Sequence, residues 1–232
     1  MSRDLYTSLA GARSAWRQIE VTANNAANTD TVGFKQSRMA FRSIGAPDSG
    51  RMGEVYATPD VIAPAMTDGA LHQTDNPMDI ALQGDGWFVL ESPGGVQLTR
   101  DGRFGLSPDG VLVNNDGRSV MGGGGMIEVQ QGETLTINEI GEVVGSKSGY
   151  IDRLKLASGP AEPMGGNLWR PIGALEEAAP RVIQGAIESS NVDPMGAMVE
   201  LIEASRHFEA FQKAMQASDE ADQRINKMGG GG

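Results

Sequence analysis

Apolar and small residues recur at alternating spacings of three and four positions at both ends of this chain. This spacing lines up side chains along one side of an α-helix and forms the seam of a coiled coil. In the C-terminal helix, expected from Pro194 to Lys227, the seam is Leu201, Ala204, Phe208, Phe211, Met215, Ser218, Asp222 and Ile225. In the N-terminal helix, expected over residues 4 to 27, it is Leu5, Leu9, Ala12, Trp16, Ile19, Ala23 and Ala26. The pattern predicts that the two ends pair in one helical domain.

Periodicity leaves two interpretations of these helices open. Each helix either packs within its own domain or packs against other subunits. Met198, Val199 and Ile202 widen the apolar face of the C-terminal helix beyond the seam, more than a single partner helix requires. The opposite face carries acidic residues early and basic residues late, which is typical of a solvated face or of ion pairs between subunits.

The N-terminal helix runs into a polar segment, residues 23 to 35. The side chains of Asn24, Asn25 and Asn28 compete with the helix backbone for hydrogen bonds and favour its end. Gly33 can adopt a positive φ, and Phe34 restarts apolar contact. The segment predicts a turn shaped by these five residues. Amides do not transfer protons, so it is a poor catalytic site.

Residues 36 to 76 are broken by residues that interrupt regular patterns, among them Gly45, Pro47, Gly50, Gly53, Pro59 and Pro64. We expect an extended connector, with helix at most from Gln36 to Ile44 and a strand near Glu54 to Thr58.

Pro77 begins the clearest β region, residues 77 to 170. Asp-Gly pairs at 85–86, 101–102, 109–110 and 116–117 separate short apolar runs, which is a hairpin signal and predicts an antiparallel meander. The expected strands are 78–82, 87–91, 96–100, 103–107, 111–114, 119–121, 127–129, 134–137, 142–145 and 153–156. Pro160 and Pro163 are expected to close the set. The expected core residues are Trp87, Phe88, Phe104, Leu154, Leu156 and Trp169.

These elements give an α+β fold: terminal helices paired in a coiled-coil core domain around a central antiparallel β-rich domain. The expected domains are residues 1–35 with 180–228 for the helices, 36–76 for the connector and 77–170 for the β domain. Residues 171–179 form a return linker and 229–232 a flexible tail.

Composition and charge exclude several partners. The net charge of -11 argues against nucleic acid, whose binders need a basic face. No window approaches 18 consecutive apolar residues, so we expect no membrane insertion. Residues 1 to 12 lack the apolar core of a cleavable secretory signal. The 232-residue chain has no cysteine, which rules out disulfides and thiolate metal sites.

No catalytic or metal motif stands out, and we expect neither an enzyme nor a cofactor. The Asp-Gly turns lack the donor spacing and terminal Glu of an EF-hand calcium loop. His72 and His207 are the two histidines, and no zinc spacing or catalytic triad can be built from them. The glycine run 122–125 lacks the Lys and Ser or Thr of a phosphate loop.

Three ordered stretches resemble the flagellar basal-body rod and hook proteins. The first is residues 23–35, with its double Asn and closing Gly33-Phe34-Lys35, although Ala26 stands where the family usually has leucine. The second is 76–88 with 99–104 and 109–113. The third is 184–192, followed by 198–204 and by Phe208, Glu209 and Lys213. Residues 158–166 depart from the family pattern, and Gly229 to Gly232 extend beyond its usual end.

The resemblance implies a structural subunit of the rod, in the periplasmic part of the basal body, that assembles helically and transmits torque. Its implied partners are other axial proteins, further copies of this chain, and the flagellar type III export apparatus. Residues 1–7 and the short length look most like the proximal rod, with a distal-rod or hook-type paralogue as the alternative. A calcium-dependent β-domain adhesin or enzyme is the rival class. We expect subunit packing by Leu5, Leu9, Trp16, Ile19, Leu201, Phe208, Phe211, Met215 and Ile225.

Overall fold

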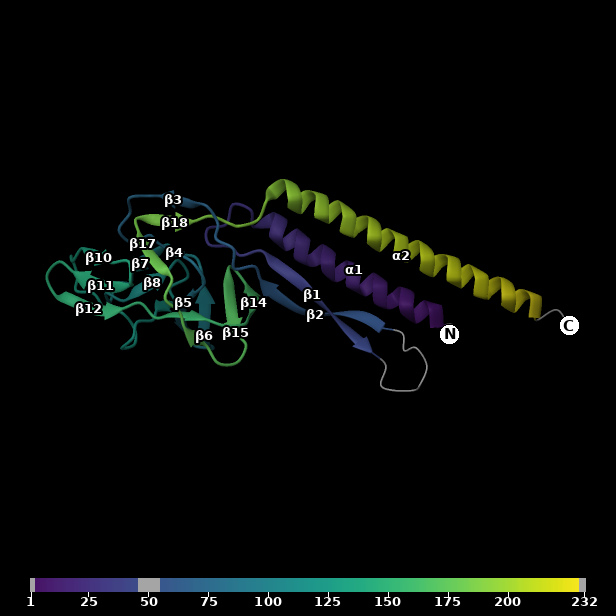
Figure 1. The fold of residues 1–232 in the computed structure, drawn as a ribbon, viewed down its shortest axis with the longest axis horizontal. Coiled ribbons are helices and arrows are strands. Elements are labelled where there is room, and N and C mark those ends of the chain that lie inside the picture. The colour runs from purple at the N-terminus through teal and green to yellow at the C-terminus, as the bar shows by residue number, and fades with distance from the viewer. Residues whose placement is uncertain (1–2, 46–54, 230–232) are drawn as a thin grey trace. The chain divides into compact units, whose positions relative to one another are not determined.

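The computed structural model describes residues 3–45 and 55–229 (Figure 1). It divides into two compact units. The first comprises residues 1–27, 39–61 and 193–232, and the second comprises 28–38 and 62–192. Both ends of the chain therefore belong to the first unit, and most of the strands belong to the second.

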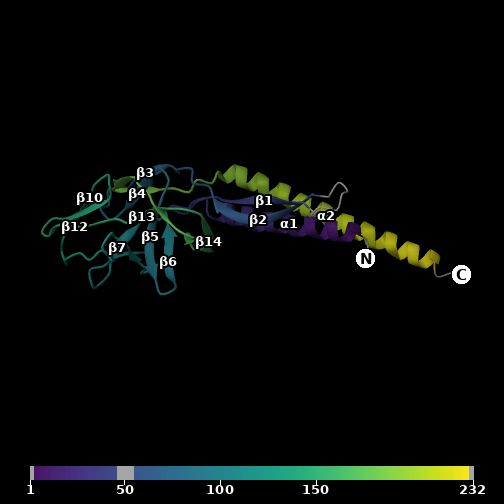
Figure 2. The ribbon, with the colours of Figure 1, turned by 60° about the horizontal axis from the view of Figure 1, so that its bottom comes forward.

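Two long helices make up most of the first unit. Helix α1 runs from Arg3 to Ala27 and helix α2 from Pro194 to Gly229. They lie antiparallel, with the N- and C-termini at the same end of the pair (Figures 1 and 2). Asp193 caps α2, because its carboxylate accepts the backbone N–H groups of Met195 and Gly196 at 3.2 and 3.0 Å. Pro194 suits the first helical position, where no intrahelical donor is needed.

A pair of strands stands where the sequence analysis allowed a helix. Strand β1 (Ser37–Gly45) and strand β2 (Val55–Pro64) form a two-stranded sheet. The possible helix from Gln36 to Ile44 is therefore wrong. The strand expected near residues 54–58 is present and longer.

The second unit is a set of antiparallel sheets. The largest follows the order β14-β15-β6-β5-β9-β8-β7, and β13 also pairs with β5 and carries β16 on its other side. Figure 2 shows β5 and β6 side by side in this unit. Its strands are β5 (Trp87–Ser92), β6 (Gly95–Thr99), β7 (Phe104–Leu106), β8 (Leu112–Asn114), β9 (Ser119–Val120), β13 (Leu156–Ser158), β14 (Ala161–Gly165), β15 (Leu168–Pro171) and β16 (Glu176–Glu177). A second sheet holds β10 (Leu135–Ile137), β11 (Glu142–Gly145) and β12 (Gly149–Arg153). Two further pairs join β17 (Arg181–Gln184) to β4 (Ile80–Gln83), and β18 (Ala186–Glu188) to β3 (Leu71–Gln73).

The core of this unit contains all six residues that the sequence analysis placed there. They are Trp87, Phe88, Phe104, Leu154, Leu156 and Trp169. Phe88 and Phe104 meet edge to face with ring centroids 5.0 Å apart, and the two tryptophan rings are 5.5 Å apart. Aromatic pairs in this geometry add to the free energy gained by burying their area.

Only two of the four Asp-Gly pairs close hairpins. Gly110 joins β7 to β8 and Gly117 joins β8 to β9, both with positive φ. The hairpin expected at 85–86 is wrong, because β4 pairs with β17 rather than with β5. At 101–102, β6 pairs with β5 and β15, and a Cβ on Gly102 would lie 1.6 Å from the Ile80 carbonyl oxygen. Position 102 therefore requires glycine because the backbone of Ile80 lies so close, and not because the chain turns there.

The sheet also continues past the two prolines that were expected to end it. Pro163 lies inside β14, an edge strand, where its missing N–H breaks no ladder hydrogen bond. The strand expected at 153–156 is displaced, since β12 ends at Arg153 and β13 begins at Leu156. The prediction of an α+β chain with terminal helices and a β-rich centre is nevertheless confirmed.

Candidate assembly site: the helix pair and a buried ionic anchor

Helices α1 and α2 meet through small residues. Ala12 and Ala15 of α1 and Ala197 and Ala204 of α2 are buried. Gly11 lies directly against the Phe211 ring, since a Cβ there would come within 2.4 Å of it. Small residues at a contact line let two helices approach closely.

One side of α2 is partly buried. Ala204 is buried, and Leu201, Phe208, Phe211 and Met215 are half-buried on the same side of the helix. Phe208 packs against Trp16 with ring centroids 5.5 Å apart. The side chain of Ile225 lies outside the described residues.

On α1 the buried side is turned by about one residue from the expected seam. The structure buries Ala15 and Thr22 in place of Trp16 and Ala23, and it leaves Leu9 56% and Trp16 51% exposed. Ile19 is half-buried, and the side chain of Leu5 is not among those described. Trp16 keeps its indole N–H satisfied by donating to Glu20 Oε1 at 2.9 Å. Two large apolar residues of the expected seam therefore remain available at the edge of the pair.

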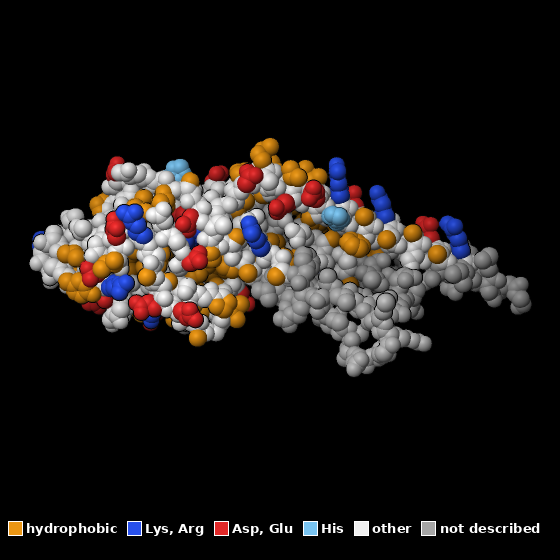
Figure 3. Space-filling view, viewed as in Figure 1, with side chains coloured by type: hydrophobic (Ala, Val, Ile, Leu, Met, Phe, Trp, Pro, Cys, Tyr) orange, Lys and Arg blue, Asp and Glu red, His pale blue; other side chains and the backbone are white. Residues whose placement is uncertain are grey.

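A second apolar patch lies on the opposite side of α2 from its seam. Over the first turns, Met195 is 71% exposed, Met198 58%, and Val199 and Ile202 54% each. At about 100° per residue these four share one face, turned away from α1. Figure 3 shows hydrophobic side chains gathered on the surface over α2. The sequence analysis anticipated this width for Met198, Val199 and Ile202 and missed Met195.

The polar segment after α1 forms a compact turn within the second unit. Asn28 accepts the Thr31 hydroxyl through Oδ1 at 3.0 Å, and the Phe34 N–H donates to the Thr31 carbonyl at 3.2 Å. Gly33 has φ of 66°, and a Cβ there would lie 2.3 Å from the Arg100 carbonyl. Phe34 is buried. Asn24 is exposed near the end of α1, whereas Asn25 is buried.

Two chain segments that lead into the helices are tied together in this unit. The Gly33 N–H donates to the Glu188 carbonyl at 2.6 Å, and the Asn191 N–H donates to the Phe34 carbonyl at 3.3 Å. Asn191 also accepts the Gln36 N–H through Oδ1 at 2.7 Å. Residues 28–38 follow α1 and residues 186–192 precede α2. The chain therefore leaves this unit toward its two helices from one place.

A buried ionic cluster, here called the anchor, reinforces this junction. It consists of Lys35, Arg100, Glu188 and Asp68. Lys35 Nζ donates to Glu188 Oε1 at 2.6 Å, and both side chains are almost completely buried. Arg100 Nε lies 3.5 Å from Glu188 Oε2, and Arg100 Nη2 bonds Asp68 Oδ1 at 3.1 Å.

Burial of the anchor disfavours the charged forms of its lysine and arginine. Burial, reinforced by the positive charge of Arg100, lowers the pKa of Lys35, while Glu188 opposes the shift. Burial likewise lowers the pKa of Arg100 against the attraction of Glu188 and Asp68. Removing one member of such a cluster leaves an uncompensated buried charge. The anchor links residues that lie far apart in the sequence through these ion pairs.

Sequence reasoning missed the anchor. The sequence analysis included Lys35, Arg100 and Glu188 in its family motifs but predicted no role for them. A lysine directly after a Gly-Phe pair that enters the core was the available signal, but its partner lies 153 residues away. Among the described residues, no group of three or more His, Asp and Glu side chains could hold a metal ion. No helix in the described part is long and apolar enough to cross a membrane.

Comparison with known proteins agrees with these features. Family models match residues 5–35 (flagella basal body rod protein), 81–145 (flagellar hook protein FlgE/F/G D1 domain) and 183–228 (flagellar basal body rod FlgEFG protein C-terminal). The chain is 32% identical to the flagellar basal-body rod protein FlgF of Salmonella typhimurium, over 98% of both chains. The chain belongs to the flagellar basal-body rod protein family. It is also 30% identical to FlgF of Escherichia coli and 28% identical to FlgG of Bacillus subtilis, over 98% and 97% of its length.

As a member of the rod family, the chain is a structural subunit of the flagellar basal body, in its periplasmic rod, and the family is not a class of enzymes. Rod proteins assemble with other flagellar axial components. The three matched regions each supply one charged residue of the anchor, namely Lys35, Arg100 and Glu188. The anchor thus contains one residue from each of the three matched regions.

Proposed function

We propose that this chain is a proximal-rod subunit whose terminal helices pair as a coiled coil and join neighbouring axial subunits, so that torque passes through packed helices. The distal-rod alternative is less favoured, because the FlgF relatives are up to 32% identical to the chain and the FlgG relatives 28%. The resemblance also supports delivery by the flagellar type III export apparatus.

The observation that carries this proposal is the exposure of large apolar side chains along both helices. Leu9 and Trp16 on α1, and the patch from Met195 to Ile202 on α2, lie in solvent in the single chain. Contiguous exposed apolar surface marks an interaction site in most soluble proteins. Most of the stability of a helix in a protein comes from packing of its apolar face. Neighbouring subunits would supply the missing burial.

The proposed packing residues are Leu5, Leu9, Trp16, Ile19, Leu201, Phe208, Phe211, Met215 and Ile225. Within one chain, Phe208 and Phe211 already contact α1. We propose that they first hold α2 against α1 and thereby shape the surface that meets a neighbour. Leu9 and Trp16 have most of their area left for a neighbour. The turn residues Asn24, Asn25, Asn28, Gly33 and Phe34 are proposed to fix how α1 enters the second unit.

Hydrogen exchange tests the proposal. Amides of α1 and α2 should exchange quickly in the purified monomer and slowly in isolated basal bodies, while β5 and β6 should be protected in both. The β strands are the internal control. Equal protection of the helices in both states would make them an ordinary intramolecular pair, and the assembly role would have to be abandoned.

A further inference from the structure

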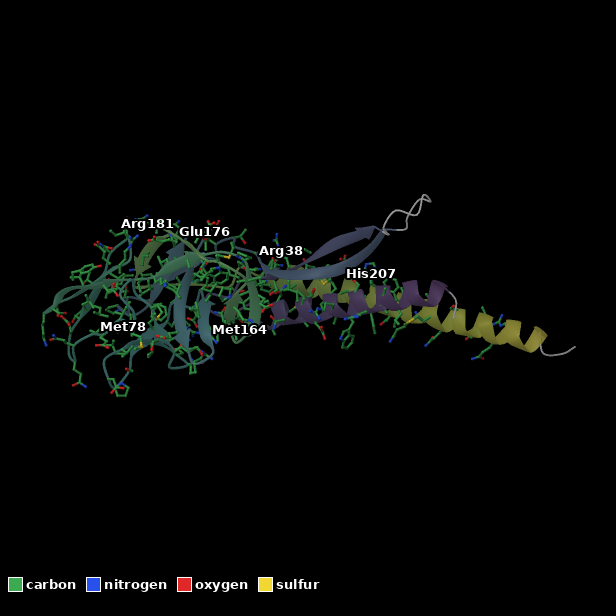
Figure 4. All side chains as sticks on the ribbon, turned by 90° about the horizontal axis from the view of Figure 1, so that it is seen from below. Arg38, Met78, Met164, Glu176, Arg181 and His207 are labelled. Atoms are coloured by element: carbon green, nitrogen blue, oxygen red, sulfur yellow. The ribbon has the colours of Figure 1, made fainter. Side chains whose placement is uncertain are left out.

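The chain passes between its two compact units at four points, because the second unit consists of residues 28–38 and 62–192. Figure 4 labels Arg38, the last residue of the first stretch, near the start of the strand pair β1–β2. Three short segments of the second unit lie next to these crossings: residues 34–36 between α1 and β1, residues 65–67 after β2, and residues 189–192 before α2. A residue that holds these segments together determines where the chain enters and leaves this unit.

Asn191, in the third segment, contacts both of the others. Its Oδ1 accepts the Gln36 N–H at 2.7 Å, and its Nδ2 donates to the carbonyl groups of Ala65 at 2.8 Å and Thr67 at 2.9 Å. The Thr67 hydroxyl oxygen lies 3.0 Å from the same nitrogen. The backbone N–H of Asn191 donates to the Phe34 carbonyl at 3.3 Å. One residue therefore connects all three segments.

A carboxamide matches the chemistry of this position. The Gln36 N–H can only donate and the two carbonyl groups can only accept, so the side chain must offer an acceptor and donors together. A carboxylate has no proton for the carbonyl groups, and an aliphatic side chain would remove this partner from all three backbone groups. Glutamine offers the same groups on a stem that is one methylene longer. Both the chemistry and the length of asparagine therefore suit the spacing of the three segments.

The anchor and Asn191 share one hydrogen-bond acceptor, the carbonyl group of Thr67. Lys35 Nζ donates to that oxygen at 2.8 Å, and it also donates to Glu188 Oε1. The charges of Lys35 and Glu188 are almost completely buried, whereas Asn191 is uncharged and half-buried. A substitution of Asn191 therefore disturbs the same segments without leaving a buried charge unpaired.

We infer that Asn191 is a positioning residue of the rod subunit. It sets the spacing of the three segments from which the chain continues into α1, α2, β1 and β2. The inference rests on the proposed assembly role, because subunits that repeat the same contacts must all present the same arrangement. None of the hydrogen-bond partners of Asn191 named above belongs to β5 or β6, so its effect is on these segments rather than on the core of the sheet.

Hydrogen exchange and motility of the Asn191→Leu variant test this inference. In the purified chain, the amides of Gln36 and Ala65 should exchange up to about tenfold faster, because the first donates to Asn191 Oδ1 and the second to the Gln36 carbonyl. Amides of β5 and β6 should exchange as in the wild type. A strain that carries only this variant should lose motility, and its isolated basal bodies should lack the chain. Asn191→Gln, which keeps the amide but displaces it, should change both measurements in the same direction.

Matched variants separate positioning from stability. Asn138 accepts the N–H groups of Ile140 and Glu142 in a turn of the same unit, so Asn138→Leu removes comparable hydrogen bonds elsewhere. Asn138→Leu should remain motile, and so should Gly117→Ala, which strains a different turn. Loss of motility in these two controls would show that motility follows stability alone, and would overturn the inference.

Three further outcomes would also overturn the inference. Equal loss of protection in β5, β6 and Gln36 would make Asn191 an ordinary stabilising residue, as would failure of both Asn191 variants to fold. Wild-type motility of Asn191→Leu would show that the rod does not need this spacing. Absence of helix protection when the wild-type chain enters the rod would instead refute the proposed function, and the exchange result for Asn191 in the purified chain would stand.

Discussion

The β unit and the helical unit complete their packing by different means. The β unit buries Trp87, Phe88 and Trp169 to within 2% exposure, and it closes its junction with the anchor. The helices meet mainly through alanine and glycine, and they leave Leu9, Trp16 and the Met195–Ile202 patch in solvent. Residues of similar hydrophobicity are therefore buried in one unit and exposed in the other, where we propose that they serve assembly.

The largest effect is expected when a charge is introduced at the contact between the two helices. Phe208→Asp places a carboxylate against the Trp16 ring and should abolish rod assembly and motility. The β unit should stay folded, as measured by the near-UV circular dichroism of its buried tryptophans. Leu9→Asp should behave in the same way.

Lys213→Asp, at an exposed position of α2, is the matched control and should remain motile. A motile Phe208→Asp strain would count strongly against the seam.

A charge removed from the anchor should instead harm folding. Glu188→Gln leaves Lys35 and Arg100 buried with only the half-exposed Asp68 for compensation. We expect the free energy of unfolding to fall by about 3–5 kcal/mol, measured by urea denaturation.

The control for this change is Glu162→Gln, which removes an exposed ion pair with Arg170. It should cost no more than about 1 kcal/mol. Equal losses in the two variants would show that the anchor is no stronger than a surface pair.

The turn before the anchor offers a smaller perturbation. Gly33→Ala adds a Cβ at φ of 66° and 2.3 Å from the Arg100 backbone, so we expect a loss of about 3 kcal/mol. Gly117 has φ of 78° with no atom within 4 Å of an added Cβ. Gly117→Ala should therefore lose only about 1 kcal/mol, from the backbone conformation alone. Chemical denaturation of both variants separates steric conflict from backbone strain.

The smallest expected effect is on pH dependence. Burial lowers the pKa of Lys35 in the folded chain, so between that pKa and the ordinary value of about 10.4 the unfolded state holds more protons. Folding stability contributed by this group therefore rises with pH in that window, by at most about 1.4 kcal/mol per pH unit. Wild-type stability minus that of Lys35→Met should grow as pH is raised. Parallel curves would contradict the shift.

Part of the candidate site could be predicted from the sequence. Leu201, Phe208 and Phe211 lie half-buried on one side of α2, as their spacing requires, because that spacing depends only on helical geometry. The side of α1 that faces α2 was not predicted, because choosing the larger Trp16 over Ala15 assumes that large residues face the partner. In the structure, α2 comes so close to α1 at Gly11 that the small Ala15, and not Trp16, is buried between the helices. The pairing of β4 with β17 was also missed, since turn chemistry describes neighbours in sequence and not partners 100 residues apart.

The sequence by itself therefore determined the local structure. It predicted helices at both ends, aromatic core residues, turns at Gly110 and Gly117, and the motifs of the rod family. These features depend on spacing and on single-residue conformational preference. Tertiary structure alone decided which strands pair, which side of α1 faces α2, and that Lys35, Arg100 and Glu188 meet in one buried anchor. Such long-range contacts are selected by the packing of the whole chain, which no local pattern encodes.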